Sequence, residues 1–342
     1  MRAAVFHSIG RPLSIERIDD PKPGDEEVII RVSRSGICGS DLHMTALPRV
    51  LSPGTVLGHE FSGEIADVGR SLAGKLKVGQ RVTALPYFSC GGCQYCDARL
   101  PALCASHQIV GVAVNRRGAY AQYVAAKASM VQRVPDGVSD DEAAMIEPLA
   151  VGYHIAHRAV GLKGAAVLVL GGGPIGASAA MAARIAGAEY VVVSEPAEMR
   201  RSRCLMLGAT NIVDPSSEVV AQRFEEITGR QPDIVLECAG RPGMLAHAIE
   251  ICATGGQVII GTVGSTYETI PADVSFLKEV KVYYSNAYSE SDFAMIIDFM
   301  AKGRIDASPM HTATIRFDEL PRIFERMRDE PAHCKVLVSP WS

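Results

Sequence analysis

The chain has 342 residues, 48% of them hydrophobic, and a formal net charge of −4 at pH 7. This length exceeds one ordinary core and predicts two domains, and the apolar content suffices to fill both cores. The weak negative charge provides no basic surface of the kind that nucleic-acid-binding proteins need. No apolar run approaches the ~18 residues that span a bilayer, and the first residues lack the apolar core of a signal peptide. We expect a cytoplasmic protein whose partners are small molecules, with no nucleic acid and no membrane among them.

The pattern of the chain changes near residue 150. Before this point, short alternating apolar runs such as residues 28–32 and 81–85 are separated by proline and glycine, which is typical of a β-rich domain. After it, apolar strands alternate with helical patterns, which predicts βαβ units and a doubly wound parallel sheet. The expected fold class is therefore α/β, with a β-rich first part.

Residues 36–60 contain the donor types of a catalytic zinc site. Such sites use three protein ligands of mixed cysteine, histidine and carboxylate character and leave one position for water or substrate. Cys38 and His59, together with either Glu60 or Glu147, supply that number. Each residue alone carries little weight, because a single cysteine is usually a small core residue. The hypothesis depends on their combination.

Four further cysteines, Cys90, Cys93, Cys96 and Cys104, are closely spaced on one short segment. Two Cys-x-x-Cys steps and a fourth thiolate can surround one tetrahedral Zn²⁺ and leave no position for water, which predicts a structural zinc site. The alternatives are unpaired thiols or two disulfides. The remaining cysteines are scattered, mostly in apolar stretches, and we expect them to be core residues without disulfides.

A glycine-rich turn follows the first strand of the second part. Residues 166–170 are fully apolar, and the run from Gly171 to Gly176 then opens an alanine-rich helix. Glycines at this spacing permit a tight turn and close backbone approach, and the helix N-terminus favours a pyrophosphate. We predict a dinucleotide site that includes Gly171, Gly173, Pro174, Ile175 and Gly176.

An acidic residue, Glu195, ends the next predicted strand, residues 190–194. A carboxylate at this position accepts hydrogen bonds from the ribose hydroxyls of NAD and repels the 2′-phosphate of NADP, so we predict NAD as the cofactor. The alternative is that Arg200 and Arg201, a few residues further on, hold a phosphate. Cys238 and Gly261, at the ends of later strands, are also assigned to the cofactor site.

The remaining elements complete a wound sheet. Strands are predicted at residues 233–237, 257–261 and 281–284, with a helix over residues 242–252. Two more helices, residues 289–302 and 317–328, lead into a last strand at residues 335–338.

These motifs resemble the zinc-containing medium-chain alcohol dehydrogenases of the sorbitol, threonine and butanediol dehydrogenase group, over nearly the whole chain. The supporting segments are residues 36–43, 58–63, the four-cysteine loop, residues 147–152 and the glycine turn. The resemblance implies a GroES-like catalytic domain over residues 1–150, completed by about 290–342, and a Rossmann NAD-binding domain over residues 151–289. It also implies an active site between the two domains, and a homodimer or homotetramer that joins its nucleotide-binding sheets edge to edge.

The resemblance also implies roles for individual residues. Zn²⁺ would act as a Lewis acid on the alcohol oxygen while hydride passes to the nicotinamide. The proton would reach solvent through Ser40 and His43, although Ser40 or Asp41 could instead cap a short helix and His43 could be a surface residue. In sorbitol and threonine dehydrogenases the residue matching Glu60 ligates the metal, and we follow that pattern, with Glu147 as a neighbouring or alternate ligand. Neighbours such as His59 and Glu60 point to opposite faces of a regular strand, so both can bind one ion only if the backbone turns there.

Two departures from the family weaken a sugar-alcohol assignment. The loop over residues 45–55 is shorter than in sorbitol-type members, and Ala287 precedes Tyr288 where polyol-specific members tend to have an arginine. The expected reaction is interconversion of a secondary alcohol (a diol, polyol or hydroxy compound) and its ketone with NAD. The rival hypotheses are a non-catalytic binding protein on this fold and a zinc-independent double-bond reductase.

Overall fold

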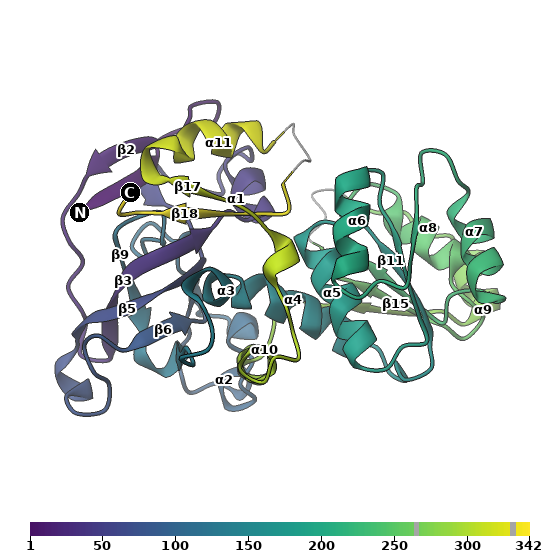
Figure 1. The fold of residues 1–342 in the computed structure, drawn as a ribbon, viewed down its shortest axis with the longest axis horizontal. Helices are drawn as coiled ribbons and strands as arrows, with labels where there is room; N and C mark the ends of the chain where they lie inside the picture. Colours follow the sequence, from purple (N-terminus) through teal and green to yellow (C-terminus); the bar gives the residue numbers. More distant parts are fainter. Residues whose placement is uncertain (263–266, 329–332) are drawn as a thin grey trace. The chain divides into compact units, whose positions relative to one another are not determined.

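The structure is a computed structural model, and it describes residues 1–262, 267–328 and 333–342. The chain forms two compact units, one made of residues 1–147 and 289–342 and the other of residues 148–288. Both chain ends lie in the first unit (Figure 1). No helix in these described ranges is long and apolar enough to cross a membrane.

The first unit is rich in β-structure, as the alternating apolar runs predict. Its largest described sheet has seven strands, six of them in the order β10-β6-β5-β3-β18-β17, and β9 pairs with β3 off this path. These strands are β3 (Glu27–Gly36), β5 (Glu60–Val68), β6 (Arg81–Ala84), β9 (Tyr123–Lys127), β10 (Val131–Arg133), β17 (His311–Arg316) and β18 (Lys335–Ser339). The yellow C-terminal strand β18 thus lies against the purple strand β3 (Figure 1). The last residues of the chain therefore belong to the same sheet as an N-terminal strand.

Smaller elements complete this unit. A three-stranded sheet and a two-stranded sheet contain β1 (Arg2–Phe6), β2 (Ser14–Arg17), β4 (Thr55–Val56), β7 (Tyr87–Phe88) and β8 (Gln108–Ile109). The helices are α1 (Gly39–Met44), α2 (Gln94–Asp97), α3 (Asp140–Ala144), α10 (Glu290–Ala301) and α11 (Leu320–Arg326), and α4 (Ile146–His157) crosses the boundary between the units. The helix predicted over residues 317–328 is shorter than expected, because residues Phe317–Glu319 form a 3₁₀ turn.

The second unit contains a six-stranded sheet in the order β13-β12-β11-β14-β15-β16, with every neighbouring pair parallel. This is the 3-2-1-4-5-6 order of a Rossmann fold. The strands are β11 (Ala166–Leu170), β12 (Tyr190–Ser194), β13 (Asn211–Val213), β14 (Ile234–Glu237), β15 (Gln257–Ile260) and β16 (Lys281–Tyr284). Strand β13 was not predicted, since a three-residue strand is too short to show a period.

Helices cover both faces of this sheet, which explains why β11 is apolar at every position. Figure 1 shows α5 and α6 on one side and α7, α8 and α9 on the other. Their bounds are α5 (Pro174–Ile185), α6 (Glu198–Met206), α7 (Val220–Thr228), α8 (Met244–Ile251) and α9 (Ala272–Lys278). Phe224 of α7 and Ile249 of α8 belong to the core on their side of the sheet. The fold is therefore the expected α/β class.

Candidate functional site

The side chains of Cys38, His59 and Glu60 converge in the first unit, with one ligand atom from each within 4.8 Å of the others. Cys38 follows the end of β3 and precedes α1, and Glu60 begins β5. Gly36 is opposite Glu60 in the antiparallel pair of β3 and β5, which brings these two segments together. These three residues form the candidate catalytic metal site, and we refer to them below as the catalytic centre.

A turn before β5 allows His59 and Glu60 to face the same point. Gly58 has φ of 97°, in the left-handed region, and a Cβ there would lie 2.8 Å from the backbone nitrogen of Tyr120. His59 consequently precedes the regular strand, and its ring and the Glu60 carboxylate both approach Cys38. The backbone turn that two adjacent ligands require is present.

The environment of His59 suits a metal ligand. Its Nε2 lies 3.5 Å from the Ser40 hydroxyl, and its Nδ1 lies 3.3 Å from Oδ1 of the fully buried Asp41. These last two atoms are close but not aligned for a hydrogen bond, and neither has another partner among the described residues. A small ring rotation would complete the carboxylate–histidine pair that holds zinc-binding imidazoles in place. Burial opposes a charge on His59, but Asp41 and Cys38 raise its pKa well above the ordinary value, so the centre attracts cations.

Asp41 is held in place by Tyr120. The buried Tyr120 hydroxyl donates to Oδ2 of Asp41 at 2.6 Å, and the carbonyl oxygen of Gly36 is also near, at 3.3 Å. Cys38, and not Ser40 or Asp41, occupies the N-cap position of α1, and no side chain caps that helix. The helix-cap interpretation of Ser40 and Asp41 is therefore wrong, and Asp41 supports His59 instead.

Glu60 forms a buried ion pair with Lys335, a residue that was not predicted to belong to the site. The Lys335 ammonium lies 2.6 and 2.7 Å from its two carboxylate oxygens, and both side chains are at most 1% exposed. The only local sign of this role is a charged residue at the start of an apolar strand, and that sign alone is too common to be informative.

The remaining predicted residues of this region lie nearby but are less connected. Ser40 donates a hydrogen bond to the Cys38 sulfur at 3.1 Å. His43 is exposed on α1, and no hydrogen bond joins it to Ser40 in the described part of the chain. Glu147 is buried at the start of α4 and is not one of the three clustered ligand residues.

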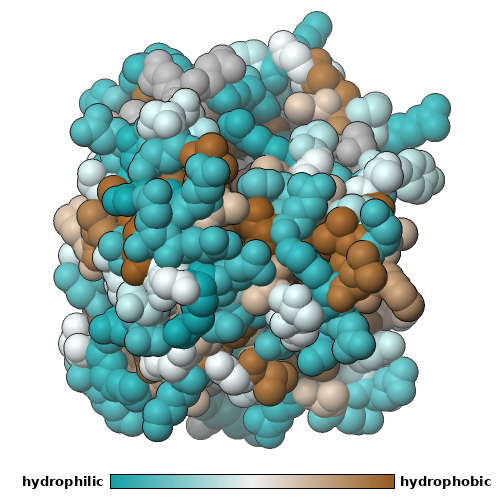
Figure 2. Space-filling model, turned by 90° about the vertical axis from the view of Figure 1, so that its right-hand side faces the viewer, coloured by the Kyte–Doolittle hydropathy of each residue, from teal (hydrophilic) through white to brown (hydrophobic). Residues whose placement is uncertain are grey.

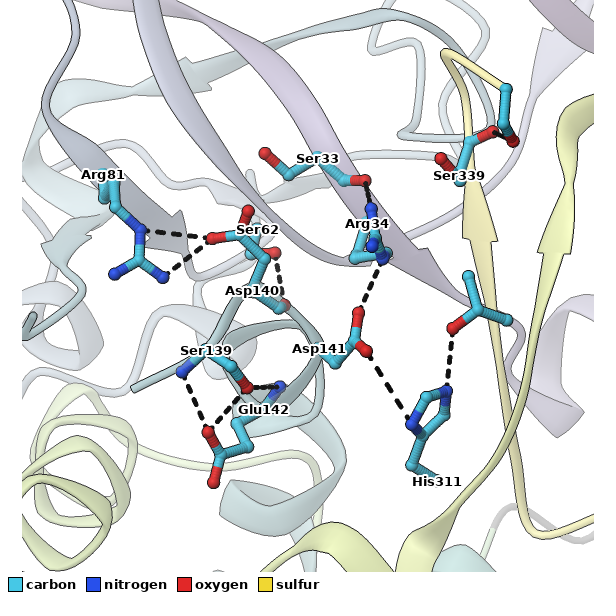
Figure 3. Close-up of polar contacts among 12 residues, drawn as sticks. Ser33, Arg34, Ser62, Arg81, Ser139, Asp140, Asp141, Glu142, His311 and Ser339 are labelled. Carbon is cyan, nitrogen blue, oxygen red and sulfur yellow. Dashed lines mark hydrogen bonds and ion pairs between the residues drawn. The ribbon is translucent and has the colours of Figure 1, made fainter. Parts of the chain in front are cut away.

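A polar network fixes the helix that precedes Glu147 (Figure 3). Ser139 and Glu142 form a capping box at the start of α3. Arg81 binds the Asp140 carboxylate at 2.8 Å, and Arg34 binds that of Asp141 at 2.6 Å. Because these arginines belong to β6 and β3, the network attaches α3 to the large sheet and so fixes the start of α4.

The four-cysteine site has the dimensions of a zinc site. The Cys96 sulfur lies 3.8 Å from that of Cys90 and 3.6 Å from that of Cys93, and Cys104 belongs to the same group. Four sulfurs placed tetrahedrally at ~2.3 Å from Zn²⁺ lie ~3.8 Å apart. The Gly91 amide donates a hydrogen bond to the Cys96 sulfur at 3.3 Å, which favours the thiolate that zinc binds. All nine cysteines are free in this structure, so it contains neither of the two disulfides that were the alternative to zinc.

The glycine turn of the second unit has the close packing that a dinucleotide site needs. A Cβ at Gly176 would lie 1.8 Å from the carbonyl oxygen of Gly171, whereas one at Gly173 would meet no atom within 4 Å. Gly173 is the N-cap residue of α5, followed by Pro174 and Ile175. The turn therefore leaves open space at a helix N-terminus, where a pyrophosphate would be stabilised.

Glu195 lies beside this turn at the end of β12. Its carboxylate accepts hydrogen bonds from the amides of Gly172 and Ala197 at 2.8 and 2.9 Å. Arg201 is bound to the carbonyl oxygens of Glu195 and Pro196 and to Asp214, and Arg200 is its neighbour on α6. Cys238 lies next to Gly176, and Gly261 is packed against Ile155.

Comparison with known proteins identifies the class to which this fold and these sites belong. Residues 24–136 match the family model described as alcohol dehydrogenase GroES-like domain, and residues 174–302 match the one described as zinc-binding dehydrogenase. The protein is thus a zinc-type alcohol dehydrogenase that acts on CH–OH donors. The chain belongs to the zinc-containing medium-chain alcohol dehydrogenase family.

Several relatives align over nearly the whole chain. Sorbitol dehydrogenase of Bacillus subtilis is 34% identical, covering 99% of this chain and 97% of its own length. L-threonine 3-dehydrogenase of Streptomyces coelicolor is 35% identical, with coverage of 91% and 92%. The crystal structure of 2R,3R-butanediol dehydrogenase from Bacillus subtilis is similar with a TM-score of 0.89, 30% identity and 99% coverage of both chains.

Two other solved relatives contain nicotinamide cofactors. A putative zinc-binding dehydrogenase of Sinorhizobium meliloti, bound to NADP, has a TM-score of 0.89, 30% identity and 99% coverage of both chains. An alcohol dehydrogenase of Escherichia coli, complexed with NADH, has a TM-score of 0.91, 26% identity and the same coverage. The relatives therefore share the use of a nicotinamide cofactor but differ in which one was bound.

Proposed function

We propose that this protein interconverts a secondary alcohol and its ketone with NAD, using a zinc ion held by Cys38, His59 and Glu60. The convergence of these three side chains is the observation that carries the proposal. When bound, zinc supplies a Lewis acid for the alcohol oxygen and NAD accepts the hydride. Three ligands leave one of four positions for the substrate.

The residues around the centre support this assignment. The Asp41 carboxylate faces the His59 ring at 3.3 Å, and Glu147 adds negative charge near Lys335 and the buried Tyr87. Glu147 remains our candidate for a neighbouring or alternate ligand. Ser40 contacts the Cys38 sulfur, and His43 lies one helical turn later on α1, where residues three apart are neighbours. We assign the outward proton path to these two residues, since both are exposed.

The second unit supports NAD as the cofactor. Gly171, Gly173, Pro174, Ile175 and Gly176 provide the open helix N-terminus for the pyrophosphate. The carboxylate of Glu195 lies at the carboxyl end of β12 beside this turn, where it would bind ribose hydroxyls and repel a 2′-phosphate. Arg201 is bound to Asp214 at 3.1 Å, and both Arg200 and Arg201 remain the arginines to test for NADP binding.

The substrate is proposed to be a less polar secondary alcohol or a vicinal diol. Ala287 precedes the buried Tyr288, so this position offers no arginine for a polyol. The named relatives include sorbitol, threonine and butanediol dehydrogenases, so these three compounds span the range to be tested. Neither rival hypothesis has a specific observation in its favour, because the ligand residues of both proposed zinc sites lie close together.

We also propose that two copies associate through the edge of the six-stranded sheet. Strand β16 is the edge strand, with Val282 37% and Tyr284 67% exposed. On the preceding helix α9, Phe276 and Leu277 are 81% and 75% exposed. An edge strand with exposed apolar neighbours is a place where another copy can pair. On the face shown in Figure 2, brown apolar side chains lie in several small groups among teal hydrophilic ones.

The experiment that tests the proposed reaction is a panel of alcohols with the zinc-loaded protein and either NAD or NADP. We expect NADH to form with 2R,3R-butanediol and other secondary alcohols at a higher kcat/KM than with matched primary alcohols. Removal of metal by a chelator should abolish the activity, and added zinc should restore it. The absence of oxidation of every secondary alcohol by fully zinc-loaded protein would contradict the proposal.

A further inference from the structure

Lys335 is the feature of the catalytic centre that the proposed reaction does not yet use. Its Nζ lies 2.6 Å from Oε1 and 2.7 Å from Oε2 of Glu60, and 3.2 Å from the carbonyl oxygen of Ile37. The lysine side chain is 1% exposed and the glutamate 0%. A lysine is rarely buried to this degree unless it is paired.

The strand geometry directs this lysine toward the centre. Strand β18 runs antiparallel to the end of β3, and the Ile37 amide donates to the carbonyl oxygen of Val336 at 2.9 Å. Val336 and Val338 belong to one hydrophobic core, so the alternation of a strand places Lys335 on the opposite face. That face is the one on which Glu60 lies.

The Glu60 carboxylate is closely enclosed on its other side. A Cβ at Gly36 would lie 2.0 Å from Oε2 of Glu60, so the carboxylate occupies the space that the missing side chain leaves. The Lys335 ammonium lies within hydrogen-bond distance of both carboxylate oxygens. Glu60 therefore has a cationic partner when no metal is present.

A metal ion at the catalytic centre would have to share this carboxylate with the ammonium. Each oxygen of Glu60 already accepts a charge-assisted hydrogen bond from Lys335. A divalent cation that takes one oxygen also meets the positive charge of the lysine nearby, and this repulsion is only partly screened in a buried site.

We propose that Lys335 is a positioning residue that competes with the metal for the Glu60 carboxylate and thereby keeps this ligand exchangeable. The inference rests on the proposed metal site. Lys335 holds the Glu60 carboxylate in position in the absence of metal, and it weakens the bond between Glu60 and the metal once the metal is present. With a neutral residue at position 335, the catalytic centre would thus bind the metal more tightly, but the metal-free protein would contain an unpaired buried carboxylate at Glu60.

The test uses Lys335→Met and Lys335→Gln in the full-length protein. Lys335→Gln keeps an amide donor for the Glu60 carboxylate, so it can be used if Lys335→Met fails to fold. The metal-free protein would be titrated with Co²⁺ in competition with a chelator, and the visible absorption of thiolate-bound cobalt would report occupancy of the Cys38 centre, with Cys38→Ser as the spectral reference. We expect affinity at the catalytic centre to rise at least about tenfold in both variants, because a full positive charge is removed from beside a divalent cation.

Three controls make the result specific. The affinity of the four-cysteine site for cobalt should not change in the Lys335 variants. Lys302→Met, which removes an exposed lysine paired with Asp298, should leave the affinity of the catalytic centre unchanged. The gain in affinity at the catalytic centre should vanish when Glu60→Gln is combined with either Lys335 variant. Unchanged or weaker metal binding in both Lys335 variants would overturn the inference. If the wild-type protein binds one metal only, and Cys38→Ser does not alter its spectrum, then the proposed metal site itself is wrong.

Discussion

Tyr120 and Asp41 are 79 positions apart in the chain, yet their side chains form a hydrogen bond of 2.6 Å in the buried interior of the first unit. This bond fixes the carboxylate that faces His59 at 3.3 Å. The order of contacts, from Tyr120 to Asp41 to His59, connects the protein core to the catalytic centre. It explains why an aspartate that does not cap α1 is nevertheless fully buried.

Tyr120→Phe should destabilise the protein by about 1–3 kcal/mol, because Oδ2 of Asp41 loses its buried hydrogen bond. Burial and the Asp41 charge hold the pKa of Tyr120 well above its usual range, so the phenol stays protonated and donates. Denaturant unfolding followed by fluorescence of Trp341, the single tryptophan, measures this change in the free energy of unfolding. Tyr267→Phe, at a fully exposed phenol, is the matched control, and an equal effect of the two variants would refute the role of Tyr120.

Two zinc ions per chain are expected, with different consequences when each site is altered. Cys93→Ser should destabilise or aggregate the protein, since the closed four-cysteine site contributes folding energy. Cys38→Ser should leave the protein folded, inactive and with one zinc fewer. Metal analysis by mass spectrometry measures these numbers, with Cys252→Ala, at a buried cysteine outside both groups, as the control. A value of one zinc or none in carefully prepared wild-type protein would contradict the prediction.

The preference for NAD over NADP is expected to depend on Glu195. Glu195→Ala should lower the ratio of kcat/KM with NAD to kcat/KM with NADP, because the carboxylate no longer repels the 2′-phosphate of NADP. Because the alanine also loses the bonds to the Gly172 and Ala197 amides, Glu195→Gln is the better-matched variant: it removes the charge and keeps an acceptor. Equal or better activity of the wild-type enzyme with NADP would show that Arg200 or Arg201 determines cofactor choice in place of Glu195. Arg200→Ala would then show which of the two arginines binds the 2′-phosphate.

His43→Ala should lower the rate of alcohol oxidation more at neutral pH than at high pH. At high pH hydroxide can take the proton directly, whereas near neutrality the loss of a general base typically costs ~100-fold or more. Ser40→Ala should show the same pattern if the two residues form one path. The check is a pH profile of kcat for both variants; profiles parallel to the wild type would assign His43 a structural role only.

The proposed association through β16 predicts that a charge on the sheet edge will produce monomers. Tyr284→Asp places a carboxylate on the exposed edge strand, where a second copy would bury it. Light scattering at several protein concentrations measures the molar mass. Met206→Asp, at a 62% exposed apolar residue of α6 in the same unit, is the control and should leave the mass unchanged. A wild-type protein that is monomeric at all concentrations would exclude this interface.

The sequence by itself determined the features whose parts lie close together in the chain. The four cysteines occupy one short segment, so their spacing was sufficient to predict the group that the structure forms. The strand, glycine turn and helix from residue 166 onward form one βα unit, and β11, β12 and β16 have the predicted bounds. Local spacing and hydrophobic period are properties of the chain itself, and they persist whatever the rest of the fold does.

Only the tertiary structure decided which partners surround the catalytic centre. Lys335 and Glu60 are 275 positions apart, and they meet because the C-terminal strand β18 pairs with β3. Likewise the left-handed turn at Gly58 lets His59 and Glu60 converge, where a regular strand would point them to opposite faces. Strand order and register are set by packing of the whole domain, so no local pattern could reveal these contacts.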